Sequence, residues 1–126
     1  MDKVVHFHIP VDDMIRAKKF YSSIFGWKIM DTGMDMEYHM VNTVATDEQG
    51  MPTETGGING ALYKRASPEE SPTMIIEVSS VDDYVRKIEF EGGKVLMPKS
   101  PVGDFGLYAE ISDTEGNKIG IFQDLK

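Results

Sequence analysis

The chain has 126 residues and a formal charge of −8, with 40% hydrophobic residues, 27% charged residues and no cysteine. This composition is typical of one globular domain with its own core. The absence of cysteine excludes disulfides and thiolate chemistry, and a reducing cytoplasm is the simplest location. We find no apolar run near the roughly 20 residues of a membrane span, no secretory signal and no Lys/Arg cluster, so neither a membrane nor a nucleic acid is an expected partner.

The first half of the chain predicts one strand, one helix and three more strands. Residues 4–9 alternate and are rich in branched and aromatic side chains, as in a strand. From 13 to 25 apolar residues recur at helical spacing. Asp12 or Asp13 is a plausible N-cap, and Gly26 ends the helix. The further strands are predicted over 27–30, 38–44 and 58–63.

The second half predicts the same order of elements. A strand over 74–78 is followed by a helix that Ser79 or Ser80 can cap and that ends at Gly92-Gly93. The remaining strands are predicted over 94–97, 107–111 and 118–123. Sliding one half over the other by about 67 residues superposes Asp13 on Ser80.

Three other segments are predicted as connections. Residues 46–57 are polar, contain several glycines and are long enough to be a lid or rim. Residues 66–72 have the composition of a linker. A loop over 98–106 could cover a binding cleft. The predicted fold class is therefore α+β, a single domain 1–126 with two tandem βαβββ modules, over about 1–66 and 72–126.

One helix per module leaves the other face of each sheet open, and two such faces turned toward each other would form a concave cleft. Strand alternation assigns side chains to these faces. In the first strand Phe7 suits the helix side, so His6 and His8 would point into the cleft together. In the penultimate strand Tyr108 and Glu110 would do the same.

Three aromatic residues complete the candidate cleft. Trp27 follows the first helix and is either a pocket aromatic or a packing residue between modules. His39 lies in the third strand, where a shift of one residue in register decides the face it occupies. Phe105 lies in the loop over the cleft. The high methionine count, nine, fits either core filling or an adaptable pocket wall.

The sequence resembles the vicinal oxygen chelate superfamily, which includes glyoxalase I, bleomycin-resistance proteins and extradiol dioxygenases. The resemblance covers nearly the whole chain and is specific for the fold. It rests on His6-Phe7-His8-Ile9-Pro10-Val11-Asp12-Asp13, Arg16-Ala17, Phe20-Tyr21, Phe25-Gly26-Trp27, Val81-Asp82-Asp83, Gly92-Gly93 and Asp113-Thr114-Glu115-Gly116-Asn117. Members of this superfamily commonly pair, so a homodimer is expected.

The resemblance also implies a metal site, which this sequence mostly lacks. Metal-dependent members carry one ligand, usually His, Glu or Gln, in each of the first, fourth, fifth and eighth strands. The matching positions here are His6, a position near Gly60, Thr73 and Gly120. Only the first can bind a divalent ion well, and a catalytic ion generally needs at least three protein ligands.

Two main functions follow from these observations. The first is a metal-independent small-molecule-binding protein of the glyoxalase/bleomycin-resistance type, without a cofactor and with His6, His8, Trp27, His39, Phe105, Tyr108 and Glu110 around its ligand. The alternative is a glyoxalase-like lyase or isomerase, or a dioxygenase-type enzyme, in which His6, His8 and Glu110 could hold a divalent metal. A partner-binding protein with an empty cleft is a third possibility.

Overall fold

The computed structural model describes residues 1–31 and 37–126. Over these residues the chain forms eight strands and two helices, in the order strand, helix and three strands, twice. This confirms the predicted α+β class and the two βαβββ modules. The chain divides into two compact units: an N-terminal unit of residues 6–72, and a C-terminal unit of residues 73–126 together with 1–5. The first five residues therefore group with the second module, where the amide of Glu77 donates to the carbonyl oxygen of Lys3 (3.0 Å).

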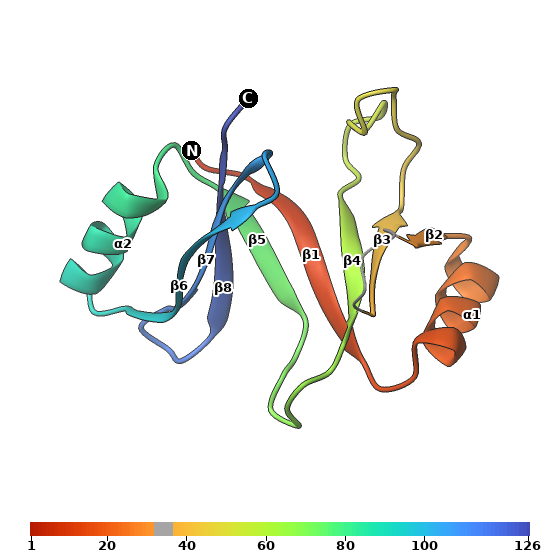
Figure 1. Ribbon diagram of the computed structural model, residues 1–126, viewed down its shortest axis with the longest axis horizontal. Helices are drawn as coiled ribbons and strands as arrows, with labels where there is room; N and C mark the ends of the chain where they lie inside the picture. Colours follow the sequence, from red (N-terminus) through yellow and green to blue (C-terminus); the bar gives the residue numbers. More distant parts are fainter. Residues whose placement is uncertain (32–36) are drawn as a thin grey trace. The chain divides into compact units, whose positions relative to one another are not determined.

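The N-terminal unit contains four strands in the order β2-β3-β4-β1 and one helix (Figure 1). Strands β1 and β4 are parallel, whereas β2 with β3 and β3 with β4 are antiparallel. The elements are β1 (Val4–Val11), α1 (Met14–Phe25), β2 (Lys28–Asp31), β3 (Tyr38–Asn42) and β4 (Asn59–Lys64).

Local signals at both ends of α1 explain its bounds. The carboxylate of Asp13 accepts a hydrogen bond from the amide of Arg16 (3.0 Å), so Asp13 is the N-cap. Gly26 ends the helix with a φ of 72°, a left-handed conformation that glycine adopts without a steric penalty. The other candidate cap, Asp12, instead pairs with the guanidinium of Arg65 (2.9 Å).

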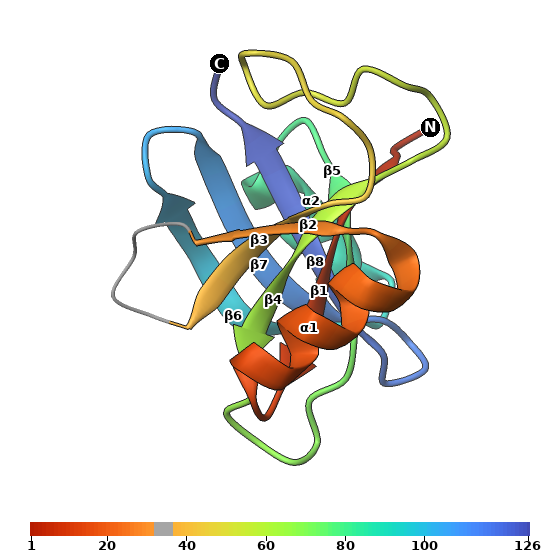
Figure 2. The same ribbon diagram turned by 90° about the vertical axis from the view of Figure 1, so that its right-hand side faces the viewer.

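The core of this unit lies between α1 and one face of its strands (Figure 2). Its buried members are Val11, Met14, Val41 and Leu62. Trp27 packs against the same core and stacks on Tyr21, with ring centroids 4.9 Å apart and planes 4° apart. One face of the sheet is therefore committed to packing, and the alternate side chains lie on the opposite face.

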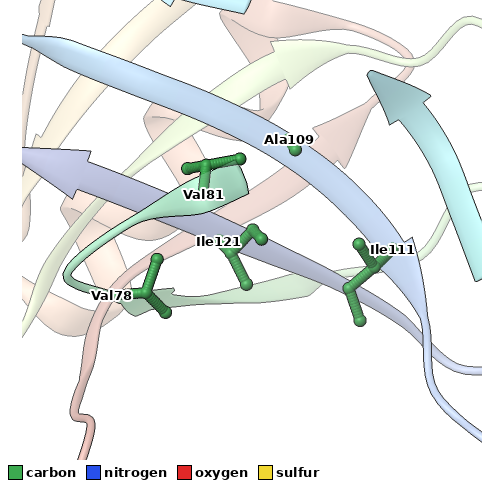
Figure 3. Packing of buried hydrophobic residues seen from close by; sticks show 5 residues of the cluster. All are labelled: Val78, Val81, Ala109, Ile111 and Ile121. Atoms are coloured by element: carbon green, nitrogen blue, oxygen red, sulfur yellow. The ribbon is translucent and has the colours of Figure 1, made fainter. Parts of the chain in front are cut away.

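The C-terminal unit repeats this arrangement with the order β5-β8-β7-β6. Strands β5 and β8 are parallel, and β8, β7 and β6 form an antiparallel meander. The elements are β5 (Thr73–Glu77), α2 (Val81–Phe90), β6 (Lys94–Val102), β7 (Gly106–Ser112) and β8 (Lys118–Asp124). Its core, shown in Figure 3, consists of Val78, Val81, Ala109, Ile111 and Ile121. Ser80 caps α2 by accepting from the amide of Asp83 (3.2 Å).

The structure corrects the prediction for residues 98–106. Strand β6 continues to Val102, so only a short turn separates it from β7. The strand passes through Pro98 and Pro101 because β6 is an edge strand of its unit. An edge strand has amides that do not take part in the ladder, so Pro98 and Pro101 are tolerated, with register shifts on either side of Met97.

Candidate functional site

The first strand places its two histidines on the face of the N-terminal sheet that α1 does not cover. Phe7 and Ile9 pack toward α1, so His6 and His8 lie on the opposite side of β1. Strand pairing extends this face across the sheet, because side chains of paired residues share a side. We call it the histidine face; its members include His6, His8, Tyr38, Met40, Asn59, Ala61 and Tyr63, and the pairing of β2 with β3 adds Lys28 and Met30 at its far edge.

His8 lies at the centre of a group of rings on this face. Its ring centroid is 5.2 Å from that of His6, 5.7 Å from that of Tyr38 and 5.9 Å from that of Tyr63. The hydroxyl of Tyr38 is 3.2 Å from Nε2 of His8, a hydrogen bond whose direction depends on the tautomer of the imidazole. The histidine pair thus forms part of a larger aromatic cluster.

The segment that follows β4 restricts the orientation of the Tyr63 side chain. Its hydroxyl donates to Oε2 of Glu70 (3.0 Å), while Oε1 of the same carboxylate accepts from the amides of Ala66 (2.5 Å) and Ser67 (3.0 Å). A carboxylate with three donors is well satisfied and holds its partners in place. The predicted linker therefore has a second role, which is to orient a ring of the histidine face.

Burial favours the uncharged forms of two members of this face. It lowers the pKa of His6 below its usual value, because an imidazolium loses hydration there. It raises the pKa of the Tyr38 hydroxyl, because a phenolate would lose hydration in the same way. As a neutral imidazole and a neutral phenol, the two side chains can offer hydrogen bonds without contributing charge.

Asn59 is on the histidine face but is occupied by the backbone. Its side-chain oxygen accepts from the amides of Thr43 (2.9 Å) and Val44 (3.2 Å), and the side chain is 9% exposed. These bonds hold the end of β3 and the start of the following loop. We therefore assign Asn59 a structural role.

Two predicted cleft residues lie on the other side of the sheet. His39 pairs with Leu62 in the antiparallel ladder and is two residues from Val41 along β3. Leu62 and Val41 both belong to the core under α1, so His39 lies on that side of the sheet. Trp27 packs with Phe7 and Tyr21 in the same core. The prediction that they line the ligand face is therefore corrected: alternation left the register of β3 open, and an aromatic residue after a helix stop is equally compatible with core packing.

In the C-terminal unit Tyr108 and Glu110 lie on the helix-free face, as alternation predicts, because Ala109 and Ile111 belong to the core under α2. The hydroxyl of Tyr108 donates to Oε2 of Glu110 (2.9 Å). Phe105 is 58% exposed in the turn before β7, and the ammonium of Lys126 lies 5.1 Å from its ring centroid. The cleft between the two modules stays a prediction.

The side chains at the positions that hold metal in the resembling enzymes suit a metal ion poorly here. Gly60 pairs with Phe7, so it faces α1, and the helix-free positions beside it are Asn59 and Ala61. At Gly120 a Cβ atom would lie 2.7 Å from the Tyr108 hydroxyl, which fills the space of a side chain there. Among residues 1–31 and 37–126 no three His, Asp or Glu side chains could hold an ion. The donor set does not fit a catalytic metal.

Sequence reasoning missed Tyr38 and Tyr63 as members of the site. The signal was present in the pairing of β3 with β4, which sets the two tyrosines opposite each other. That pairing depends on the length of the connection between the strands, which the sequence pattern left open. Once the register is known, both rings fall on the side of His8.

Two βαβββ modules with polar side chains on their helix-free faces define the vicinal-oxygen-chelate class. The chain belongs to the Glyoxalase/Bleomycin resistance protein/Dioxygenase superfamily, whose family model matches residues 3–121. It is also similar to "Putative glyoxylase CFP32" of Mycobacterium bovis and of Mycobacterium tuberculosis, at 31% identity over 114 residues and 88% of this chain. The chain spans 41% of the length of these relatives.

Solved structures support the same fold. A methylmalonyl-CoA epimerase of Streptomyces coelicolor, in complex with 2-nitronate-propionyl-CoA, matches 98% of each chain with a TM-score of 0.69 and 14% identity. A glyoxalase/bleomycin resistance protein/dioxygenase superfamily member from Vibrio splendidus matches 98% of this chain and 100% of its own, with a TM-score of 0.67 and 10% identity. At these identities the likeness establishes the fold alone. In the described part of the chain, neither helix has the length and apolarity to cross a bilayer.

Proposed function

We propose that the protein binds a small molecule without a metal, through the helix-free face of its N-terminal unit. The observation that carries this proposal is the chemistry of that face. It offers imidazoles, phenols and a thioether, whereas the four positions used for metal in the resembling enzymes hold His6, a non-ligand in β4, Thr73 and Gly120. Neutral hydrogen-bonding rings orient a ligand without needing an ion.

The proposed contacts are His6, His8, Tyr38 and Tyr63. Each is half-buried, so each retains surface for a ligand while its orientation is restricted by neighbours. Tyr63 is restricted most clearly, through Glu70. Residues whose conformations are set before binding lose less entropy on binding, which favours affinity. Tyr108 and Glu110 of the C-terminal unit remain predicted contacts.

Metal independence is tested by metal analysis. The protein is stripped with a chelator, equilibrated separately with Zn²⁺, Ni²⁺, Mn²⁺ and Fe²⁺, and desalted before inductively coupled plasma measurement. We expect far less than one ion per chain, with the same result for His6→Gln. One tightly held ion per chain that His6→Gln abolishes would contradict the proposal.

A second candidate function is a lyase of the glyoxalase type, favoured by the similarity to the relative named as a glyoxylase. In this case one of the two imidazoles of His6 and His8 would act as a base and the other, in its protonated form, as an acid, which are roles that histidine can take near neutral pH. Turnover of a hemithioacetal that His6→Ala abolishes and Tyr84→Phe preserves would establish it. Absence of turnover in the wild-type protein with each added metal would leave the binding function.

Homodimer formation remains part of the proposal. Family members commonly pair, and closed twofold assemblies are the most frequent oligomers. Sedimentation velocity at micromolar concentration is expected to give twice the mass of the chain. A monomer across that range would remove pairing from the proposed function without affecting the binding site of the single unit.

A further inference from the structure

The outer surface of α1 combines exposed apolar side chains with cations. Phe20, Ile24 and Phe25 are 54%, 62% and 58% exposed, and the ring centroids of Phe20 and Phe25 are 6.3 Å apart. Arg16 precedes Phe20 and Ile24 at intervals of four residues, so the three form one row along the helix. Adjacent exposed apolar side chains often mark a surface that a partner covers. We define the α1 patch as Ile15, Arg16, Lys19, Phe20, Ile24 and Phe25.

The cations of the α1 patch are not neutralised within the described part of the chain. Arg16 and Lys19 take part in none of the ion pairs that join residues of 1–31 and 37–126. Helix α1 contains three basic residues and no acidic residue, whereas the whole chain carries −8. The patch is therefore a basic and apolar surface on an acidic protein, and it suits an acidic and apolar counterpart.

The end of α2 has the opposite character. Phe90 is 88% exposed, and Glu89 and Glu91 flank it in the sequence. The ammonium of Lys87, one turn before Glu91, lies 4.7 Å from the ring centroid of Tyr84. Among the described residues, neither Glu89 nor Glu91 takes part in an ion pair. We call Glu89, Phe90 and Glu91 the α2 end; it is an exposed ring between two carboxylates.

The α1 patch and the α2 end match each other in chemistry. Each offers exposed phenylalanine with charge beside it, and the charges are of opposite sign, as in an interface with an apolar centre and a polar rim. Two α1 patches facing each other would instead set cations against cations, which weakens association. An anionic membrane surface usually recruits roughly four to eight basic residues, more than α1 carries, and it would repel the negative charge of the whole chain.

We propose that the α1 patch of one protomer docks on the α2 end of a second copy of the chain, and that the two copies do so reciprocally. This inference rests on the homodimer of the proposed function and deepens it by naming the surfaces that meet. Each copy carries both surfaces, so a twofold pair makes the contact twice. Burial of the phenylalanine rings supplies affinity, and the charges beside them select the partner.

Charge reversal tests the contact, because two variants can be mixed. Arg16→Glu/Lys19→Glu makes both surfaces of its chain acidic, whereas Glu89→Lys/Glu91→Lys makes both basic. Each variant alone should raise the dissociation constant of the dimer by about ten-fold or more, measured by sedimentation velocity at low salt. An equimolar mixture should restore pairing, because both contacts of the mixed dimer again join opposite charges.

Two controls exclude other causes. Lys3→Glu/Lys126→Glu changes the net charge by the same amount as the α1 variant but at the chain ends, and it should leave the dissociation constant within about three-fold of the wild-type value. Phe90→Ala removes an exposed ring and should weaken the dimer about ten-fold. Because Phe90 is exposed in the single chain, its loss should leave the urea midpoint of the monomer unchanged.

The outcomes separate the named surfaces from pairing itself. A monomeric wild-type protein would overturn the homodimer and this contact with it. A wild-type dimer with either charge-reversed variant pairing as tightly would leave the homodimer and overturn the surfaces. Two monomeric variants that stay monomeric when mixed would show that the α1 patch and the α2 end do not meet. Binding of monomeric wild-type protein to phosphatidylserine vesicles, lost in Arg16→Glu/Lys19→Glu, would assign the α1 patch to a membrane surface instead.

Discussion

The two modules share one scaffold but support their helices differently. Helix α2 has Asp82 and Asp83 in its first turn and Lys87 in its last, so side-chain charges complement its dipole. Helix α1 has no acidic residue in its first turn and no basic residue in its last, and several of its large apolar side chains are exposed. α1 therefore depends more on its caps and on the packing of Tyr21 with Trp27.

The helix-free faces differ even more than the helices. The N-terminal face carries two imidazoles and two phenols, whereas the C-terminal face carries the Tyr108–Glu110 pair over Gly120. The repeated module keeps what the core requires, because the helix side of each sheet must remain apolar and close-packed. The opposite side has no such constraint, so it can diverge with function. The predictions below test this difference between the side of each sheet that packs on a helix, which we call the constrained face, and the helix-free side, which we call the free face.

The largest effect is expected at Gly60, on the constrained face. A Cβ atom there would lie 2.4 Å from the carbonyl oxygen of Phe7 and 2.5 Å from its ring. The neighbouring strand cannot move away without breaking its pairing, so Gly60→Ala should reduce the free energy of unfolding by about 3 kcal/mol. Urea denaturation measures this change. A loss below about 1 kcal/mol would show that β1 and β4 can separate without penalty.

The next effect distinguishes the two helices at their N-caps. Asp13→Ala removes both a capping bond and a negative charge near the N-terminus of α1, which we expect to reduce stability by about 1.5 kcal/mol. Ser80→Ala removes a neutral cap from a helix that retains Asp82 and Asp83, and should reduce stability by about 1 kcal/mol. Thermal and urea unfolding of both variants measure the difference.

Asp12→Ala is the matched control for the first helix. It removes only an exposed ion pair with Arg65, so its effect should be about 0.5 kcal/mol. A larger loss for Asp12→Ala than for Asp13→Ala would reverse the assignment of the cap. Equal losses for Asp13→Ala and Ser80→Ala would remove the proposed difference between the helices.

A smaller effect is expected at Gly120, on the free face. A Cβ atom there would lie 2.7 Å from the Tyr108 hydroxyl and 2.8 Å from Cγ1 of Ile75, both side-chain atoms. Because side chains can rotate away, Gly120→Ala should reduce stability by only about 1 kcal/mol. It should also displace the phenol from Glu110, which the aromatic proton shifts of Tyr108 report. If Gly120→Ala reduces stability as much as Gly60→Ala does, the two faces do not differ in how well they accommodate an added side chain.

The difference between local and long-range interactions explains which features the sequence could predict. Apolar spacing and the caps Asp13, Ser80 and Gly26 are local signals, and they predicted both helices and the order of strands. The alternation of side chains along a strand was enough to place His6 and Tyr108 on the helix-free faces of their sheets. The face of His39 and the membership of Tyr63 depend on pairing between strands joined by long connections, which no local pattern sets. Strand β6 passed through two prolines because its edge position, a tertiary property, removed their penalty.

The last and smallest expected effect is on the pH dependence of stability. It concerns only the N-terminal unit among the histidines, because all three histidines of the chain lie within residues 6–72. Burial lowers the pKa of His6 in the folded protein below its unfolded value of about 6.5. On acidification the unfolded chain takes up this proton first, so His6 contributes stability above about pH 6.5 that is lost as pH falls toward its folded pKa. His6→Gln should therefore flatten the decline of the urea midpoint between about pH 7 and 5, and it should leave the pH dependence of the midpoint above about pH 7.5 unchanged. Parallel midpoint curves for the two proteins would show that the imidazole at position 6 is as readily protonated when folded as when unfolded, and the neutral character of the histidine face would then require another cause.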